Sequence, residues 1–132
     1  MRNLLIFIFC TIHTAVFAND LGKDTYQTSC KSCHAPQLAI GMKAPAAFDK
    51  KAWDARFKNA EMEAQKNPAD YKTAMDYLLY SIKLGKGLMP HGGLCKEANV
   101  PQKNCSDEAF VEAIHYMAQE KKSGSTDNKA PE

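Results

Sequence analysis

The sequence predicts an all-α protein of one domain. Segments with helical periodicity dominate the chain, whereas sustained alternation of apolar and polar residues is absent and Val and Ile are few. The length of 132 residues fits one domain. Apolar residues are not abundant for a chain of this size, so a large apolar cofactor or a crosslink would help it to fold.

The first two helices are expected over about residues 21–33 and residues 50–66. Asp49 stands directly before the second helix, where its side chain is a suitable N-cap. Trp53 and Phe57 lie one turn apart in that helix and therefore share a face.

A third helix is expected from Asn67-Pro68 to Gly85 or Gly87, because Pro favours a helix start and Gly a helix end. Its apolar stripe consists of Tyr71, Met75, Leu78, Leu79 and Ile82. A fourth helix is expected to begin at Ser106, a good N-cap followed by two acidic residues that suit the positive end of the helix dipole. Its buried face consists of Phe110, Val111, Ile114 and Met117.

The first 18 residues predict a secretory signal peptide. One cation, Arg2, precedes an apolar run that ends in Val16-Phe17-Ala18, with small residues at the positions that a signal peptidase reads. An uncleaved anchor is the alternative, but the run is short and His13 interrupts it, whereas a membrane span needs about 20 apolar residues. We therefore expect residues 1–18 to direct export to the periplasm, and we expect no stable membrane anchor.

The charges nearly balance, with 17 Lys and Arg against 15 Asp and Glu. A nucleic-acid binder would need a strong basic excess, so nucleic acid is not an expected partner. The rest of the chain divides into a domain over residues 19–120 and a tail over residues 121–132, which has no apolar anchor and is expected to be disordered. Within the domain, residues 35–48 and the Gly- and Pro-rich residues 85–105 are expected to be loops.

Cys30, Cys33 and His34 form the motif C-x-x-C-H, to which haem is attached through two thioether bonds. On a helical turn, residues three apart lie on one side, so both sulfurs can reach the two vinyl-derived carbons of one porphyrin edge. The imidazole that follows can then bind the iron. The motif therefore predicts one covalent haem c, held by Cys30 and Cys33, with His34 as a ligand of its iron.

Other uses of this motif stay open. A redox-active C-x-x-C would want a βαβ surrounding, and the chain lacks strand signals. A zinc ribbon would want a second C-x-x-C, which the sequence does not contain. A plain structural disulfide between Cys30 and Cys33, or a chance occurrence, is the remaining alternative.

Several segments resemble class I cytochromes c. Residues 21–34, LGKDTYQTSCKSCH, are similar to the start of that family, with Gly22 and Tyr26 where a glycine and an aromatic precede the haem motif. The segment AFVEAIHYMA resembles the C-terminal helix that crosses the first one. FDKKAW and LMPHGG resemble the bacterial cytochrome c-five type. The resemblance spans about residues 20–119 and implies a small class I cytochrome c fold, with four or so helices wrapped around one covalent haem.

A haem iron that only moves electrons needs a second axial ligand, and the sequence favours Met89. Met89 lies in the long Gly- and Pro-rich loop, which can wrap to the side of the haem opposite His34. Met42 follows His34 closely in the chain and is less favoured, and His91, two residues from Met89, is a further alternative. The resemblance of LMPHGG also implies Met89. The other three methionines after residue 18 lie on helical patterns and are expected in the core: Met62, Met75 and Met117.

Cys95 and Cys105 remain as an even pair in a protein that is expected to be exported. A disulfide between them would close a short loop and contribute about 3 kcal/mol. A zinc site with His91 and His115 is the alternative, although the spacings match no common zinc finger. In the c-five type the corresponding cysteine pair is more closely spaced.

Together these features predict an exported monohaem c-type cytochrome with His/Met ligation, which carries single electrons and is not an enzyme. The alternatives are an electron-entry haem subunit of a larger oxidoreductase, a haem protein with an open iron site, such as a peroxidase or gas sensor, and a binding module without haem. Redox proteins are expected as transient partners, and homo-oligomerisation is left undetermined. A positive rim that steers such partners, or a set of ordinary solvated lysines, would consist of Lys31, Lys43, Lys83 and Lys86.

Overall fold

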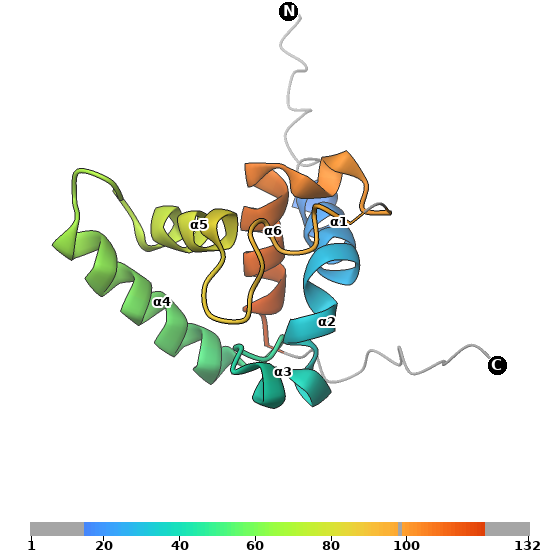
Figure 1. The fold of residues 1–132 in the computed structure, drawn as a ribbon, viewed down its shortest axis with the longest axis horizontal. Helices are drawn as coiled ribbons and strands as arrows, with labels where there is room; N and C mark the ends of the chain where they lie inside the picture. The colour runs from blue at the N-terminus through green and yellow to red at the C-terminus, as the bar shows by residue number, and fades with distance from the viewer. Residues whose placement is uncertain (1–14, 98, 121–132) are drawn as a thin grey trace, which may run out of the picture.

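The computed structural model describes residues 15–97 and 99–120, and these residues are mainly helical (Figure 1). In chain order the elements are α1 (Ala15–Thr25), η1 (Tyr26–Cys30), α2 (Lys31–His34), α3 (Pro36–Met42), α4 (Lys50–Lys66), α5 (Ala74–Leu84), η2 (Gln102–Cys105) and α6 (Asp107–Met117). η1 is a turn of π-helix and η2 a turn of 3₁₀-helix. The described residues form no strand, so the all-α prediction is confirmed.

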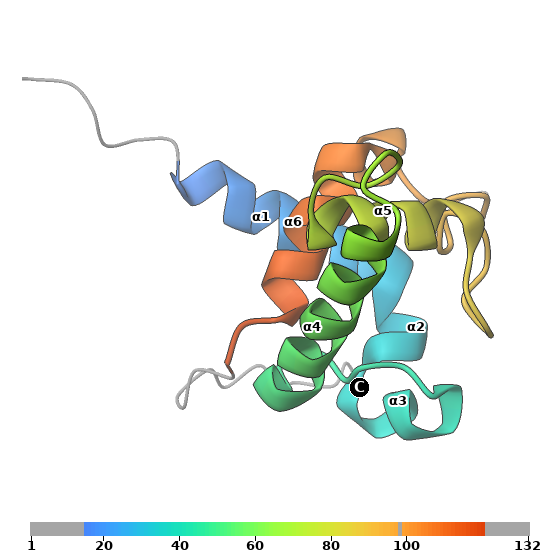
Figure 2. The same cartoon turned by 90° about the vertical axis from the view of Figure 1, so that its left-hand side faces the viewer.

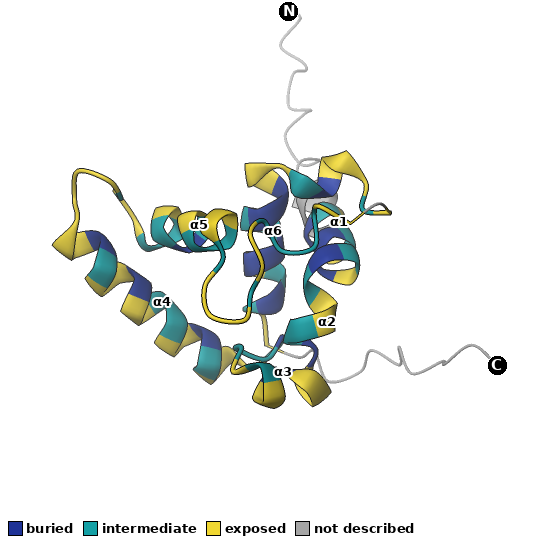
Figure 3. Ribbon diagram, viewed as in Figure 1, coloured by how far each residue is buried: buried dark blue, intermediate teal, exposed yellow. Residues whose placement is uncertain are grey.

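The first and last helices, α1 and α6, lie side by side and cross each other (Figures 1 and 2). Gly22 makes this approach possible, because a Cβ at that position would lie 2.8 Å from the carbonyl carbon of Glu112 on α6. Only glycine permits two helix backbones to come so close here. Figure 3 shows buried positions along both helices.

Helices α4 and α5 pack against each other, and α5 also contacts α6, so α5 lies between α4 and α6 in the view of Figure 1. The shared core draws on η1, α4, α5 and α6. Its larger buried side chains are Tyr26, Trp53, Leu78, Ile114 and Met117. No helix among the described residues has both the length and the apolar character needed to cross a membrane.

Two helix starts are where the sequence predicts them. The Asp49 side chain accepts a hydrogen bond from the Ala52 amide at 3.0 Å, and α4 then covers residues 50–66 as expected. The Ser106 hydroxyl accepts a hydrogen bond from the Ala109 amide at 3.1 Å and caps α6. Both caps satisfy amides that have no partner within the first helical turn.

The predicted start of the third helix at Asn67 is wrong. Asn67 ends α4, and α5 begins only after Thr73, which forms a capping box with Asp76. Tyr71 therefore lies outside the helix, although its ring still contacts the ring of Tyr77 at a centroid distance of 5.3 Å. The predicted end at Gly85 is confirmed, with a φ of +75°.

Three further expectations need correction. Residues 21–33 do not form one regular helix, because the π-helical turn η1 interrupts it. Residues 35–48 are not only loop, since α3 occupies half of them and ends at Met42. Met62 is 44% exposed and not a core residue, whereas Met117 is buried as predicted.

The two chain ends cannot be compared with their predictions in full. Of the predicted signal peptide, residues 1–14 lie outside the described part, and the last four residues belong to α1. The predicted tail, residues 121–132, also lies outside it.

Candidate functional site

The C-x-x-C-H motif lies at one wall of a partly open cavity of about 500 Å³. Cys30 ends the π-helical turn, and Cys33 and His34 lie in the short helix α2 that follows. All three side chains line the cavity, and both thiols are free of a disulfide. The volume falls within the range of about 300–1,000 Å³ that is typical of ligand and cofactor sites.

The opposite walls of the cavity are mostly apolar. They come from α5, α6 and the chain that follows α5, and they consist of Leu78, Ile82, Leu94, Phe110, Ala113, Ile114 and Met117. A large apolar ring system fits such walls, because it replaces water against surfaces that water solvates poorly. The residues present therefore suit a covalently held porphyrin.

His34 is oriented by the chain segment that follows α3. Its Nδ1 lies 2.9 Å from the carbonyl oxygen of Pro45, and because a carbonyl can only accept, Nδ1 carries the proton. The Nε2 lone pair is then free to bind a metal. The indole N–H of Trp53 donates to the carbonyl of Ala46 at 3.0 Å, and its ring stacks on the imidazole at 6.0 Å. Trp53 thus holds both the ring and the segment that orients it.

The protonation of these groups fits ligand roles better than thiol exchange. Burial lowers the pKa of His34; the hydrogen bond to Pro45 opposes this effect, and the charge of Arg56 adds to it. The imidazole is therefore kept neutral, as metal binding requires. Burial also raises the pKa of Cys30 to about 12, with a further contribution from Cys33. A thiol protonated at neutral pH is a poor nucleophile for disulfide exchange.

The structure brings two of the three candidate second ligands to this cavity. Met89 and Met42 both line it, whereas the exposed His91 is not among its lining residues. Met42 ends α3, three residues before Pro45, and so belongs to the segment that orients His34. Met89 comes from the chain after α5, on a different part of the fold.

A tight turn sets the course of the chain that carries Met89. The Met89 amide donates to the carbonyl of Lys86 at 3.1 Å. Gly85 must be glycine, because it has a φ of +75° and a Cβ there would lie 2.6 Å from the Met89 carbonyl oxygen. Leu88, at the tip of this turn, is 63% exposed although it also lines the cavity.

Positive side chains stand at the cavity, but not all four lysines of the predicted rim. Lys43 and Lys86 line it, and Lys86 donates to the Tyr77 hydroxyl at 2.8 Å. Lys83 forms an ion pair with Asp107 at 2.8 Å instead. The sequence reasoning missed Arg56, which also lines the cavity and lies one turn after the buried Trp53 on α4. That spacing was the signal that would have identified it.

The structure joins Cys95 to Cys105 in a disulfide, with their Cα atoms 5.6 Å apart. This separation is usual for the bond. Among the described residues, no group of three or more His, Cys, Asp or Glu side chains is arranged to hold a metal ion. His115 is exposed on α6, so the alternative zinc site has no support in this geometry.

Comparison with known protein families gives one match. Residues 17–117 match the family described as cytochrome C oxidase, cbb3-type, subunit III, so the match includes α2 with its motif and the Met89 segment. No curated protein and no solved structure matches. Proteins with this domain are c-type haem proteins of electron transfer. Because the match covers most of the chain, the protein belongs to this family of class I c-type cytochromes, and its cofactor is covalently bound haem c.

Proposed function

We propose that the protein is an exported monohaem cytochrome that carries single electrons, with Cys30 and Cys33 holding the haem and His34 and Met89 as axial ligands. The observation that carries this proposal is the meeting of His34 and Met89 at one apolar cavity, from two separate parts of the fold. The bound haem c supplies a one-electron couple of its iron.

The two thiols and the imidazole would act as one unit. Cys30 and Cys33 form thioether bonds from consecutive helical elements, and His34 presents Nε2 because Pro45 engages Nδ1. The carbonyl of Pro45 fixes the tautomer and raises the basicity of the ligand. Trp53 limits rotation of the ring by stacking on it.

Met89 is the better second ligand for a geometric reason. Met42 ends α3 and lies only three residues before Pro45, whose carbonyl holds His34, so it is tied to the same part of the chain as the first ligand. Met89 approaches from the chain after α5 and has no such constraint. A thioether is a soft, neutral ligand that favours the reduced iron and raises the potential. Two protein ligands leave no open position, which suits a carrier and disfavours an enzyme.

The proposed cellular setting rests on the leader-like composition of residues 1–18 and on the cysteine chemistry of the chain. Residues 1–18 act as a leader that is removed on export to the periplasm, residues 19–120 form the cytochrome domain, and residues 121–132 form a tail. The periplasm also favours the bond between Cys95 and Cys105, because disulfides persist in oxidising compartments. Within class I, the FDKKAW and LMPHGG segments favour the c-five type.

Partners would be redox proteins that bind briefly at the exposed side of the cavity. Lys43, Lys86 and the exposed Leu88 all line the cavity, so an acidic partner would be steered by charge and contacted through an apolar side chain. Weak encounters of this kind bury small areas.

A second candidate function is supported by the family description, which names a subunit of an oxidase. The protein would then be a dedicated electron-entry subunit. Purification from native extract distinguishes the two, because a subunit would co-purify with a stoichiometric partner and a carrier would not.

The decisive experiment is a redox titration of the purified holoprotein, followed by visible absorption and combined with mass spectrometry. We expect the mass of one attached haem, a low-spin spectrum in both oxidation states, and one reversible one-electron transition. A chain without haem, a chain with two haems, or a high-spin reduced form that binds carbon monoxide rapidly would contradict the proposal.

A further inference from the structure

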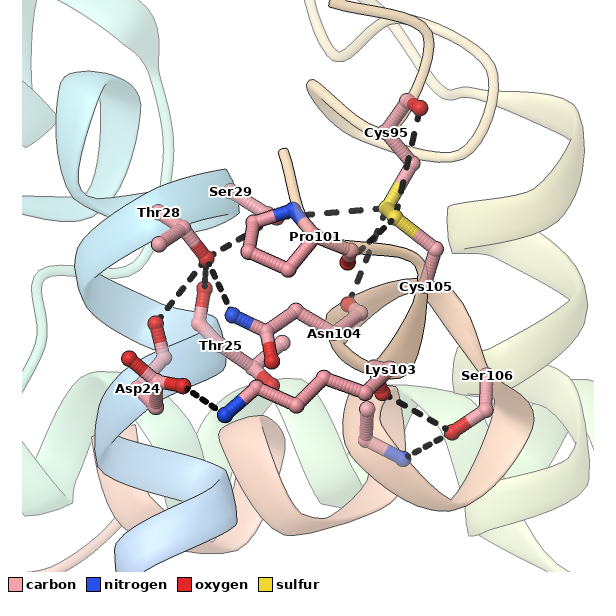
Figure 4. Close-up of a disulfide and its surroundings, with 11 residues drawn as sticks. Asp24, Thr25, Thr28, Ser29, Cys95, Pro101, Lys103, Asn104, Cys105 and Ser106 are labelled. Atoms are coloured by element: carbon pink, nitrogen blue, oxygen red, sulfur yellow. Dashed lines mark hydrogen bonds and ion pairs between the residues drawn. A yellow bond between two sulfur atoms is a disulfide. The ribbon is translucent and has the colours of Figure 1, made fainter. Parts of the chain in front are cut away.

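The 3₁₀-helical turn η2, which follows the Met89 loop, is bonded to the π-helical turn η1, which contains Cys30 (Figure 4). Asn104 in η2 has no exposed surface. Its side-chain Nδ2 donates to the hydroxyl of Thr28 in the π-helical turn η1 at 3.0 Å. This bond links two residues that are far apart in the chain. Asn104 directly precedes Cys105, and Thr28 lies two residues before Cys30.

The directions of the hydrogen bonds are determined by valence. The Thr28 hydroxyl donates to the carbonyl of Asp24, four residues earlier, at 2.9 Å. Thr hydroxyls within helices commonly bond back to the carbonyl four residues earlier in this way. The single hydroxyl proton is thus used, and the oxygen accepts from Asn104. This fixes the orientation of the Asn104 amide.

The contact continues to the disulfide and the loop. The Sγ of Cys95 lies 3.9 Å from the hydroxyl oxygen of Ser29, and a Cβ at Gly93 would lie 3.4 Å from the Ser29 carbonyl. Ser29 is buried and directly precedes Cys30. The far end of the Met89 loop is therefore seated on the residue next to the first haem-binding cysteine.

Stability alone does not account for this buried amide. The Oδ1 of Asn104 and the hydroxyl oxygen of Thr25 are both buried without a hydrogen-bond partner in the protein. Such oxygens are destabilising, and an apolar pair of similar shape would often do as well or better. What the Asn104 amide does make is the bond that joins η2 to η1, and this bond carries the inference.

We propose that Thr28 and Asn104 are positioning residues, which hold the disulfide-closed loop against the π-helical turn so that the Met89 sulfur stays at the cavity. The proposal rests on the proposed role of Met89 as the second ligand. Without the Thr28–Asn104 bond, the loop and its disulfide would move together, and the ligand position would be vacant in a larger fraction of molecules.

The test is the affinity of the oxidised holoprotein for imidazole, a small ligand that binds where Met89 has left. Thr28→Val removes the hydroxyl at constant shape, and Thr28→Ser keeps it. We expect Thr28→Val to bind imidazole about fivefold more tightly and to have a lower reduction potential, because one hydrogen bond no longer opposes loop opening. Thr28→Ser should restore the wild-type values.

Lys103→Ala is the matched control. Lys103 pairs with Asp24 at 2.9 Å and so joins the same two segments, but both side chains are largely exposed. Exposed pairs contribute little, so its imidazole affinity should stay within about twofold of wild type. Asn104→Ala removes the donor from the other side and serves as the second variant where Thr28→Val yields too little holoprotein.

Two outcomes overturn different statements. A lower melting temperature in Thr28→Val and Asn104→Ala, with unchanged imidazole affinity and potential, would show a merely structural role and end this proposal. If wild type already binds imidazole as tightly as Met89→Ala does, then Met89 is not the ligand, and the proposed function fails instead.

Discussion

The two parts of the chain that meet at the cavity are held in different ways. The first, residues 30–34, lies in consecutive helical turns, and its imidazole is fixed by a carbonyl and a ring from nearby segments. The second, residues 85–95, has no regular helix and an exposed tip at Leu88. Its course depends on Gly85, on the disulfide of Cys95, and on contacts with η1.

This difference separates two properties of a cytochrome. In the proposed assignment, attachment of the haem would depend on the first region, where the required groups are neighbours in the chain. The proposed second ligand, Met89, and with it the potential, would depend on the second region, whose position is set by contacts between distant segments. We therefore expect changes in the first region to abolish the holoprotein and changes in the second to alter a holoprotein that still forms.

The largest effect is expected from replacing both motif cysteines. Cys30→Ala together with Cys33→Ala removes both thioether bonds, so the exported chain should contain no covalent haem and lose its folded core. Mass spectrometry and visible absorption of the periplasmic fraction measure this. Retention of covalent haem by the double variant would disprove attachment at this motif.

Removal of the second ligand should leave the haem attached. Met89→Ala should lose the low-spin spectrum and lower the potential by on the order of 0.1 V, within the roughly 0.8 V range that axial ligands span. Redox titration and visible absorption measure both changes. Met42→Ala is the matched control and should keep the wild-type spectrum. The reverse result would assign the second ligand to Met42.

Loss of the disulfide tests the closure of the loop. Cys95→Ser together with Cys105→Ser should lower the free energy of unfolding by about 3 kcal/mol, because the unfolded chain loses a constraint. Denaturant unfolding of the holoprotein gives the value, and the haem content should equal that of wild type. A drop in haem content with no drop in stability would place this pair in the attachment machinery.

The smallest effects are expected from replacing two glycines of the second region, Gly85 and Gly87. Gly85→Ala adds a Cβ against the Met89 carbonyl at a φ of +75° and should cost about 2 kcal/mol. Gly87→Ala faces open space at a φ of +64° and should cost about 1 kcal/mol. Denaturant unfolding measures both, and the spectrum of Gly85→Ala should also show partial loss of the methionine ligand. Equal losses of unfolding free energy in the two variants would mean that the backbone near Gly85 shifts to accept the added Cβ.

Local patterns predicted some parts of this molecule well. The Asp49 and Ser106 caps, the full extent of α4 and the end of α5 at Gly85 follow from short-range rules, because each depends on backbone groups within one turn. The same short-range rules predict the wrong start for α5, because they allow more than one starting residue. Thr73 and Asp76 already contained a capping signal, but Asn67-Pro68 looked like the stronger start.

Other parts could not be inferred from local patterns. The π-helical turn and the Thr28–Asn104 bond both depend on which segments pack together. A single residue type at each of these positions has many ordinary uses, so its role is visible only when its distant partner is in place.

Local sequence patterns predict the attachment motif and the helical class, because the two thiols, the imidazole and the helix caps act over a few neighbouring residues. The three-dimensional packing shows which segments surround the cavity, that Met89 and His34 both line it while His91 does not, and that η2 is bonded to η1. These facts depend on long-range packing of α1 against α6, which local propensity does not encode.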